Sequence, residues 1–167
     1  TEAEWEYAIR AGTLTAFYNG DITFLGSDPL DLTLDAIAWY AGNSDGMAHP
    51  VGLKEPNAWG LYDMAGNVWE WVSDSYEGYP GNSYELQEEF GDYFKVVRGG
   101  SWDNAAQHLR STFRQNNPPN LRSDGTGFRC AISASDFEPT QAEESAVEEE
   151  PAIIEEPAPD EAAPEST

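Results

Sequence analysis

The chain has 167 residues, with 8 Lys and Arg against 31 Asp and Glu, so its formal net charge is −23 at pH 7. A surface this negative repels the phosphates of nucleic acids, which excludes a general nucleic-acid-binding role. The apolar runs are far shorter than the roughly 20 residues of a membrane span, and a single cysteine excludes internal disulfides and metal sites built from several thiolates.

The first predicted element is a helix that begins at the first residue. Thr1 and Glu4 have the spacing of a capping box, and Trp5 and Ile9 then fall on one helical face until Gly12. A natural chain normally carries residues ahead of its first helix cap. We therefore expect this sequence to be an N-terminally truncated part of a longer protein.

The middle of the chain is dense in Gly, Asn, Asp, Pro and Trp and contains only short extended runs. Residues 94–98 and 127–132 alternate as strands do, and the second run places Phe128, Cys130 and Ile132 on one face. The many large aromatic rings are suited to fill a core that has little regular structure. We predict a loop-rich α+β domain in which Cys130 is buried as a small hydrophobic residue.

The composition changes abruptly near Ser135. Residues 136–167 contain 12 acidic side chains and no basic ones. Such a segment cannot bury enough apolar area to offset its conformational entropy. We predict a domain over residues 1–135 and a disordered acidic tail over 136–167, with the alternative that a short apolar island at 152–154 binds a partner.

A Gly-Asn turn in the middle of the chain is flanked by two acidic residues. Asp63 and Glu70, together with the backbone carbonyls of Gly66 and Val68, offer the all-oxygen shell that Ca²⁺ prefers. In the alternative interpretation, Asp63 caps a turn and Glu70 is the polar residue of an alternating strand. The residue chemistry alone leaves both interpretations open.

Four motifs follow one another along the chain: TEAEWEYA at 1–8, NAWGLYDMAGNVWEW at 57–71, VRGGSW at 97–102 and GFRCA at 127–131. In this order they closely resemble the formylglycine-generating enzymes, also called sulfatase-modifying factors. The resemblance covers residues 1–132. It implies a C-type-lectin-like fold, of which this chain holds the C-terminal part, and a structural calcium site formed by Asp63, Gly66, Val68 and Glu70.

The resemblance also implies where a copper site would lie. Catalytic members of the family oxidise a sulfatase cysteine to formylglycine, using copper(I) held by two cysteines that follow the Gly-Gly-Ser serine by three and eight residues. Counting from Ser101, these positions are Asn104 and Leu109. Copper(I) selects thiolates, which an amide and a hydrocarbon cannot replace. The sequence therefore predicts that copper is not a cofactor and that this domain does not itself form formylglycine.

A ligand pocket is still expected. Ser101 and Trp69 match positions that line the family's active site, and Asn104, His108 and Arg110 add polar groups nearby. In the alternative interpretation, Arg110 pairs with a carboxylate and His108 is a surface residue.

Two classes of function stay open. The first is a non-enzymatic lectin-like module that binds a peptide, a protein or a small molecule. The second is part of a non-haem iron enzyme whose catalytic ligands lie upstream. In either case the domain can be fused to further domains, because copies of it occur joined to bacterial kinases and signalling modules.

Overall fold

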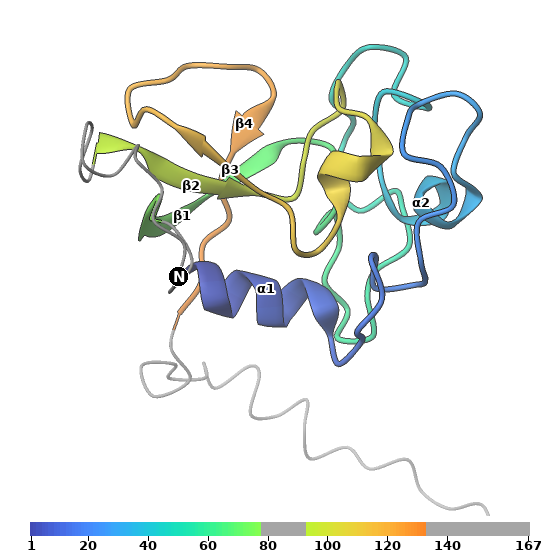
Figure 1. Ribbon diagram of the computed structural model, residues 1–167, viewed down its shortest axis with the longest axis horizontal. Helices are drawn as coiled ribbons and strands as arrows, with labels where there is room; N and C mark the ends of the chain where they lie inside the picture. Colours follow the sequence, from blue (N-terminus) through green and yellow to red (C-terminus); the bar gives the residue numbers. More distant parts are fainter. Residues whose placement is uncertain (78–92, 133–167) are drawn as a thin grey trace, which may run out of the picture. The chain divides into compact units, whose positions relative to one another are not determined.

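The computed structural model describes residues 1–77 and 93–132 (Figure 1). Within these ranges the chain forms two α-helices, a 3-10 helix and four short strands connected by long loops, which confirms the predicted α+β class. In chain order the elements are α1 (Glu2–Arg10), α2 (Leu32–Ile37), β1 (Trp69–Ser75), β2 (Lys95–Arg98), the 3-10 helix η2 (Ala106–Leu109), β3 (Arg114–Asn117) and β4 (Thr126–Gly127).

The predicted tail and its boundary at Ser135 lie outside the described residues. No helix in the described part of the chain is both long and apolar enough to cross a membrane.

The strands form a sheet in the order β3-β2-β1-β4. β2 runs antiparallel to β1 and β3, whereas β4 is parallel to β1 and pairs with it over only two residues. On one side Glu70 pairs with Arg98, and on the other it pairs with Gly127. The register therefore places three of the four sequence motifs side by side in the sheet.

Helix α1 lies along one face of this sheet (Figure 1) and is built as its sequence predicts. The Thr1 hydroxyl accepts a hydrogen bond from the Glu4 amide at 3.3 Å, and the Glu4 carboxylate contacts Thr1 in return. Trp5 and Ile9 are buried against the rest of the domain. The helix ends at Arg10, and Ala11 is its C-cap in the left-handed conformation, one residue before the Gly12 expected to end it.

The remainder of the core is packed between loops. Leu34 and Ile37 of α2 are fully buried, together with Met64 and Leu109. Gly66 lies at the centre of this packing with φ of 75°, and a Cβ atom added there would lie 2.3 Å from the carbonyl oxygen of Trp39. Only glycine fits such a position.

One of the two predicted strands is confirmed, and the other is wrong beyond its first residue. The run 94–98 forms β2, but β4 ends at Gly127, and the side chains of Phe128, Cys130 and Ile132 are exposed. The prediction that Cys130 is buried is therefore wrong. Alternation buries one face of a strand only where another layer covers it, and the described residues place no such layer over this segment. Arg129 instead turns back toward Glu70.

Candidate metal centre and ligand pocket

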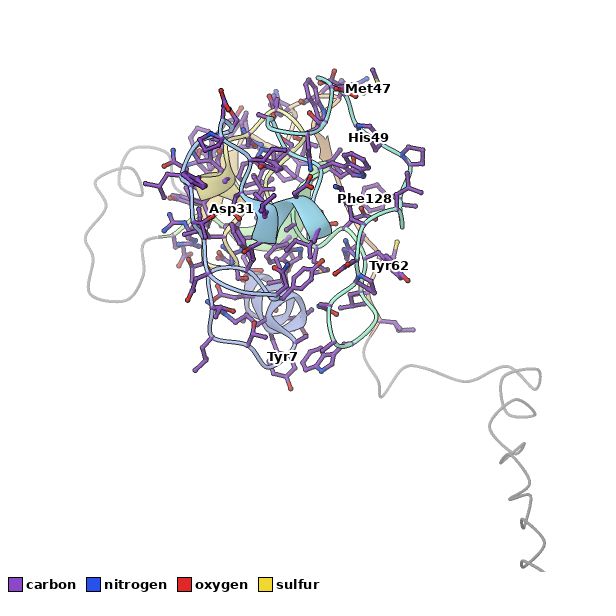
Figure 2. The ribbon with its side chains drawn as sticks, turned by 90° about the vertical axis from the view of Figure 1, so that its right-hand side faces the viewer. Tyr7, Asp31, Met47, His49, Tyr62 and Phe128 are labelled. Atoms are coloured by element: carbon purple, nitrogen blue, oxygen red, sulfur yellow. The ribbon has the colours of Figure 1, made fainter. Side chains whose placement is uncertain are left out.

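The four residues predicted to bind calcium come together in the structure. Asp63, Gly66, Val68 and Glu70 all line one cavity of about 460 Å³. Tyr62, Phe128 and Arg129 line the same cavity, and Figure 2 shows Tyr62 and Phe128 on the same side of the domain. The cavity wall thus holds the four candidates and adds Arg129, which was not among the predicted site residues.

The turn that carries these residues is fixed by Asn67, which the sequence analysis did not single out. Its side-chain Oδ1 accepts a hydrogen bond from the His49 amide at 2.9 Å, and its Nδ2 donates to the His49 carbonyl at 3.0 Å. Its backbone amide donates to the Trp39 carbonyl at 2.8 Å. Asn67 also has a positive φ of 63°, a conformation that asparagine tolerates better than most residues. The Gly-Asn pair in the sequence was the available signal for this role.

Glu70 is buried and holds two partners. The indole Nε1 of Trp5 donates to Glu70 Oε2 at 2.7 Å. Arg129 donates through Nε to both carboxylate oxygens, at 2.9 and 2.8 Å, and through Nη2 to Oε1 at 2.6 Å. Burial works to lower the pKa of Arg129, but the hydrogen bonds and the negative charge of Glu70 outweigh it and raise that pKa above its usual value.

Asp63 contributes oxygen atoms to the same cavity. Its Oδ2 accepts a hydrogen bond from the Gly52 amide at 2.7 Å. Arg129 Nη2 also donates to the backbone carbonyls of Tyr62 and Asp63, at 3.1 and 3.2 Å. The atoms that could act as metal ligands here are carboxylate and carbonyl oxygens, the class of ligand that suits Ca²⁺. In the described part of the chain no three His, Cys, Asp or Glu side chains form a metal cluster, so a cation at this site would draw on backbone carbonyls as well.

The predicted pocket residues divide into two groups. Ser101 is buried, and its hydroxyl lies 2.5 Å from Asp103 Oδ1 and 2.8 Å from Asn104 Oδ1. Asn104 Oδ1 also accepts from the Ser101 amide at 3.0 Å. Asn104 therefore stabilises the turn that follows the Gly-Gly-Ser motif.

The second group surrounds Phe113, which sequence reasoning missed. The ring centroids of Trp69 and His108 lie 6.1 and 4.9 Å from that of Phe113, and the Arg110 guanidinium lies 6.0 Å from it. Arg110 Nε donates to the Gln107 carbonyl at 2.9 Å. His108 Nδ1 is buried and has no hydrogen-bond partner among the described residues. Trp69 lies between the two groups: its backbone amide donates to the Gly125 carbonyl at 2.8 Å, and a Cβ atom added at Gly125 would lie 3.6 Å from the Ser101 side chain.

Asn104 and Leu109, the two positions where the resemblance implied copper ligands, both serve the fold here. Asn104 supports the Ser101 turn, as described. Leu109 is fully buried. Its side chain lies so close to Gly66 and Gly100 that Cβ atoms added at those glycines would approach it to 3.0 and 2.7 Å.

Comparison with known proteins finds a family whose match covers all four sequence motifs. The model of the family described as "Sulfatase-modifying factor enzyme 1-like domain" matches residues 1–134. The chain belongs to this family. The resemblance inferred from the four motifs is confirmed.

Several relatives of this sulfatase-modifying factor domain are much longer than the chain. The mouse protein named "Inactive C-alpha-formylglycine-generating enzyme 2" is 37% identical over 144 residues, which cover 80% of this chain and 42% of the relative. The serine/threonine-protein kinase pkn1 of Chlamydia pneumoniae is 35% identical, over 78% of this chain and 20% of the kinase. Among solved structures, Treponema denticola variable protein 1 superposes with a TM-score of 0.63 at 34% identity, covering 77% of this chain and 44% of that one. The chain thus spans less than half the length of each of these relatives.

Proposed function

We propose that this sulfatase-modifying factor domain has a C-type-lectin-like fold and binds a ligand without forming formylglycine. One observation carries the proposal. The two positions that would supply copper ligands are Asn104, which stabilises the Ser101 turn, and Leu109, which is fully buried in the core. The name of the mouse relative, which describes that protein as inactive, is consistent with this.

The coordination chemistry of copper(I) leads us to expect a complete loss of formylglycine formation. Copper(I) requires soft, electron-rich ligands, such as the sulfur atoms of Cys and Met. An amide oxygen and a hydrocarbon side chain provide none. Without the metal the oxidation cannot begin, so we expect no conversion at all.

The test uses the full-length protein that carries this domain. It is incubated with copper(I), oxygen and a peptide containing the Cys-x-Pro-x-Arg core of the family's substrates, and the peptide is analysed by mass spectrometry. We expect no aldehyde above a protein-free copper control. Aldehyde formation above that control, abolished by Ser101→Ala, would contradict the proposal. The double variant Asn104→Cys, Leu109→Cys is the matched control. If this variant takes up copper and the parent does not, the parent lacks only the two sulfur ligands of a copper site.

The proposed ligand site is the group around Phe113 together with Ser101. Aromatic faces, one guanidinium and a buried His108 Nδ1 that still requires a partner are suited to a peptide, a protein segment or a small polar molecule. We also propose that the domain is one part of a larger protein, since the same domain fills only 20% of the Chlamydia kinase.

Calcium is the proposed structural cofactor, bound by Asp63, Gly66, Val68 and Glu70. The support is that all four line one cavity and that the turn between them is held by Asn67. When bound, the ion would brace this turn. The residues that hold it would be the two carboxylates and the carbonyl oxygens of Gly66 and Val68.

A further inference from the structure

Arg129 already occupies one of the two carboxylates proposed to bind calcium, that of Glu70. Its guanidinium donates hydrogen bonds to four different oxygen atoms: both carboxylate oxygens of Glu70 and the carbonyl oxygens of Tyr62 and Asp63. An ionised carboxylate offers about four acceptor positions. Trp5 uses one position on Glu70, and the contacts of Arg129 use the rest.

We propose that Arg129 and calcium are alternative occupants of this site and that Arg129 acts as a tethered competitor of the metal. The inference rests on the proposed calcium site. Calcium binds oxygen at about 2.3–2.6 Å, and the Arg129 nitrogens lie 2.6–2.9 Å from the Glu70 oxygens. The two cations would compete for the same Glu70 oxygens and would repel each other at this distance. One must leave when the other binds.

The structure provides a place for the displaced side chain. Arg129 is on the wall of the 460 Å³ cavity, and its side chain is already 34% exposed. Moving outward would return the guanidinium to water, so displacement does not leave a buried charge without a partner. Trp5 contacts Glu70 through Oε2 alone and can remain bound during the exchange.

The exchange connects the metal to the segment after β4. Arg129 follows Gly127 by two residues, and β4 pairs with β1 through Thr126 and Gly127 only. The contacts of Arg129 with Glu70 are therefore a principal attachment of this segment to the sheet. Calcium binding would release that attachment. Calcium would bind only the molecules in which Arg129 has left Glu70, so its apparent affinity would be the intrinsic affinity multiplied by the fraction of those molecules.

The test measures calcium affinity in the full-length protein by isothermal titration calorimetry. We expect Arg129→Gln to bind calcium at least tenfold more tightly than the parent, because it lacks the competing charge. Arg129→Lys should bind with intermediate affinity, since an ammonium keeps the charge but not the planar fork. Arg122→Gln is the matched control: Arg122 is an exposed arginine on the loop before β4, and its replacement should leave the affinity unchanged.

The possible results separate the two proposals. Equal affinities of the parent and both Arg129 variants would overturn the competition and leave the calcium site standing. If neither the parent nor Arg129→Gln binds calcium, the calcium site itself is wrong and the competition with it. Near-ultraviolet circular dichroism monitors whether the variants fold. If Arg129→Gln does not fold, the calcium affinity of Arg129→Lys is compared with that of the parent instead.

Discussion

At the scale of single residues, Gly66 shows how closely the turn is fitted to the core. Its Cβ position is blocked by the Trp39 carbonyl and by Leu109, and its φ is positive. Gly60 has nearly the same φ, 76° against 75°, but no atom lies within 4 Å of its Cβ position. The two glycines therefore share the same conformational demand and differ only in packing.

We predict that Gly66→Ala destabilises the domain by about 3 kcal/mol and Gly60→Ala by about 1 kcal/mol. Both variants incur the cost of a left-handed alanine, whereas only Gly66→Ala also forces its neighbours apart. Urea denaturation of the full-length protein measures the difference. Equal losses for the two variants would show that the crowding around Gly66 is relieved without cost.

Asp31 is fully buried beside α2 (Figure 2) and is the N-cap of that helix. Burial works to raise its pKa, but hydrogen bonds outweigh it and hold the pKa below its usual value. The donors include the backbone amides of Phe24, Thr23 and Leu34. Because the folded-state pKa is the lower one, the carboxylate stabilises the fold fully above the unfolded-state pKa of about 3.9. This contribution is lost as the pH falls from there toward the folded-state value.

We predict that Asp31→Asn lowers the free energy of unfolding at pH 7 by about 2 kcal/mol, because an amide cannot accept all of these hydrogen bonds. The variant should also lose less stability than the parent between pH 5 and pH 2. Urea midpoints across this pH range provide the measurement. Asp21→Asn is the control, since Asp21 is exposed and, among the described residues, accepts one hydrogen bond, from the Ala16 amide. If Asp31→Asn loses as much stability between pH 5 and pH 2 as the parent does, Asp31 is not the cause of the acid sensitivity.

At the scale of elements, local signals were predictable and distant pairings were not. Helix α1 follows from a capping box and an apolar face that lie within ten residues, and both were visible in the sequence. β2 was likewise predicted by its own alternation. The run 127–132 alternates equally well, but the strand ends at Gly127 because its burial depends on a neighbouring layer. Alternation carries no information about that layer.

The same distinction applies to the site. Asp63, Gly66, Val68 and Glu70 lie within eight residues of one another, so the sequence could bring them together as candidates. The partners of Glu70 are 65 residues before it and 59 residues after it, in Trp5 and Arg129. Nothing in the local pattern identifies such partners. Arg129 comes near Glu70 only through the pairing of β1 with β4, and Trp5 only through the packing of α1 on the sheet.

Arg98 of β2 shows what such distant pairings contribute. Its side chain is fully buried, and its Nη2 donates to Glu6 Oε2 of α1 at 2.6 Å and to the Ser111 carbonyl at 2.8 Å. A buried guanidinium without such partners would carry a large desolvation cost. The orientation of α1 on the sheet is therefore fixed by charge as well as by the packing of Trp5 and Ile9.

At the scale of the whole molecule, the net charge of −23 favours binding of a divalent cation. We predict that millimolar calcium raises the melting temperature of the full-length protein and that excess chelator lowers it. A ligand that binds only the folded state adds about 2.7 kcal/mol at one hundred times its Kd. Differential scanning calorimetry with and without calcium is the measurement.

The controls for this prediction are Asp63→Asn and Glu70→Gln, each of which removes one anionic ligand. Their melting temperatures should respond less to calcium than that of the parent. If chelator leaves the parent's melting temperature unchanged, or if both variants respond as the parent does, the four residues do not form a calcium site.

The exposure of Cys130 gives this molecule a built-in position for an optical label. The chain contains one cysteine, its thiol is accessible, and it directly follows Arg129. Within this chain a maleimide dye would therefore attach at a single position, beside the side chain that holds this segment to Glu70. If calcium displaces Arg129 as proposed, the emission of the dye would change when calcium is added, without any residue of this chain being replaced.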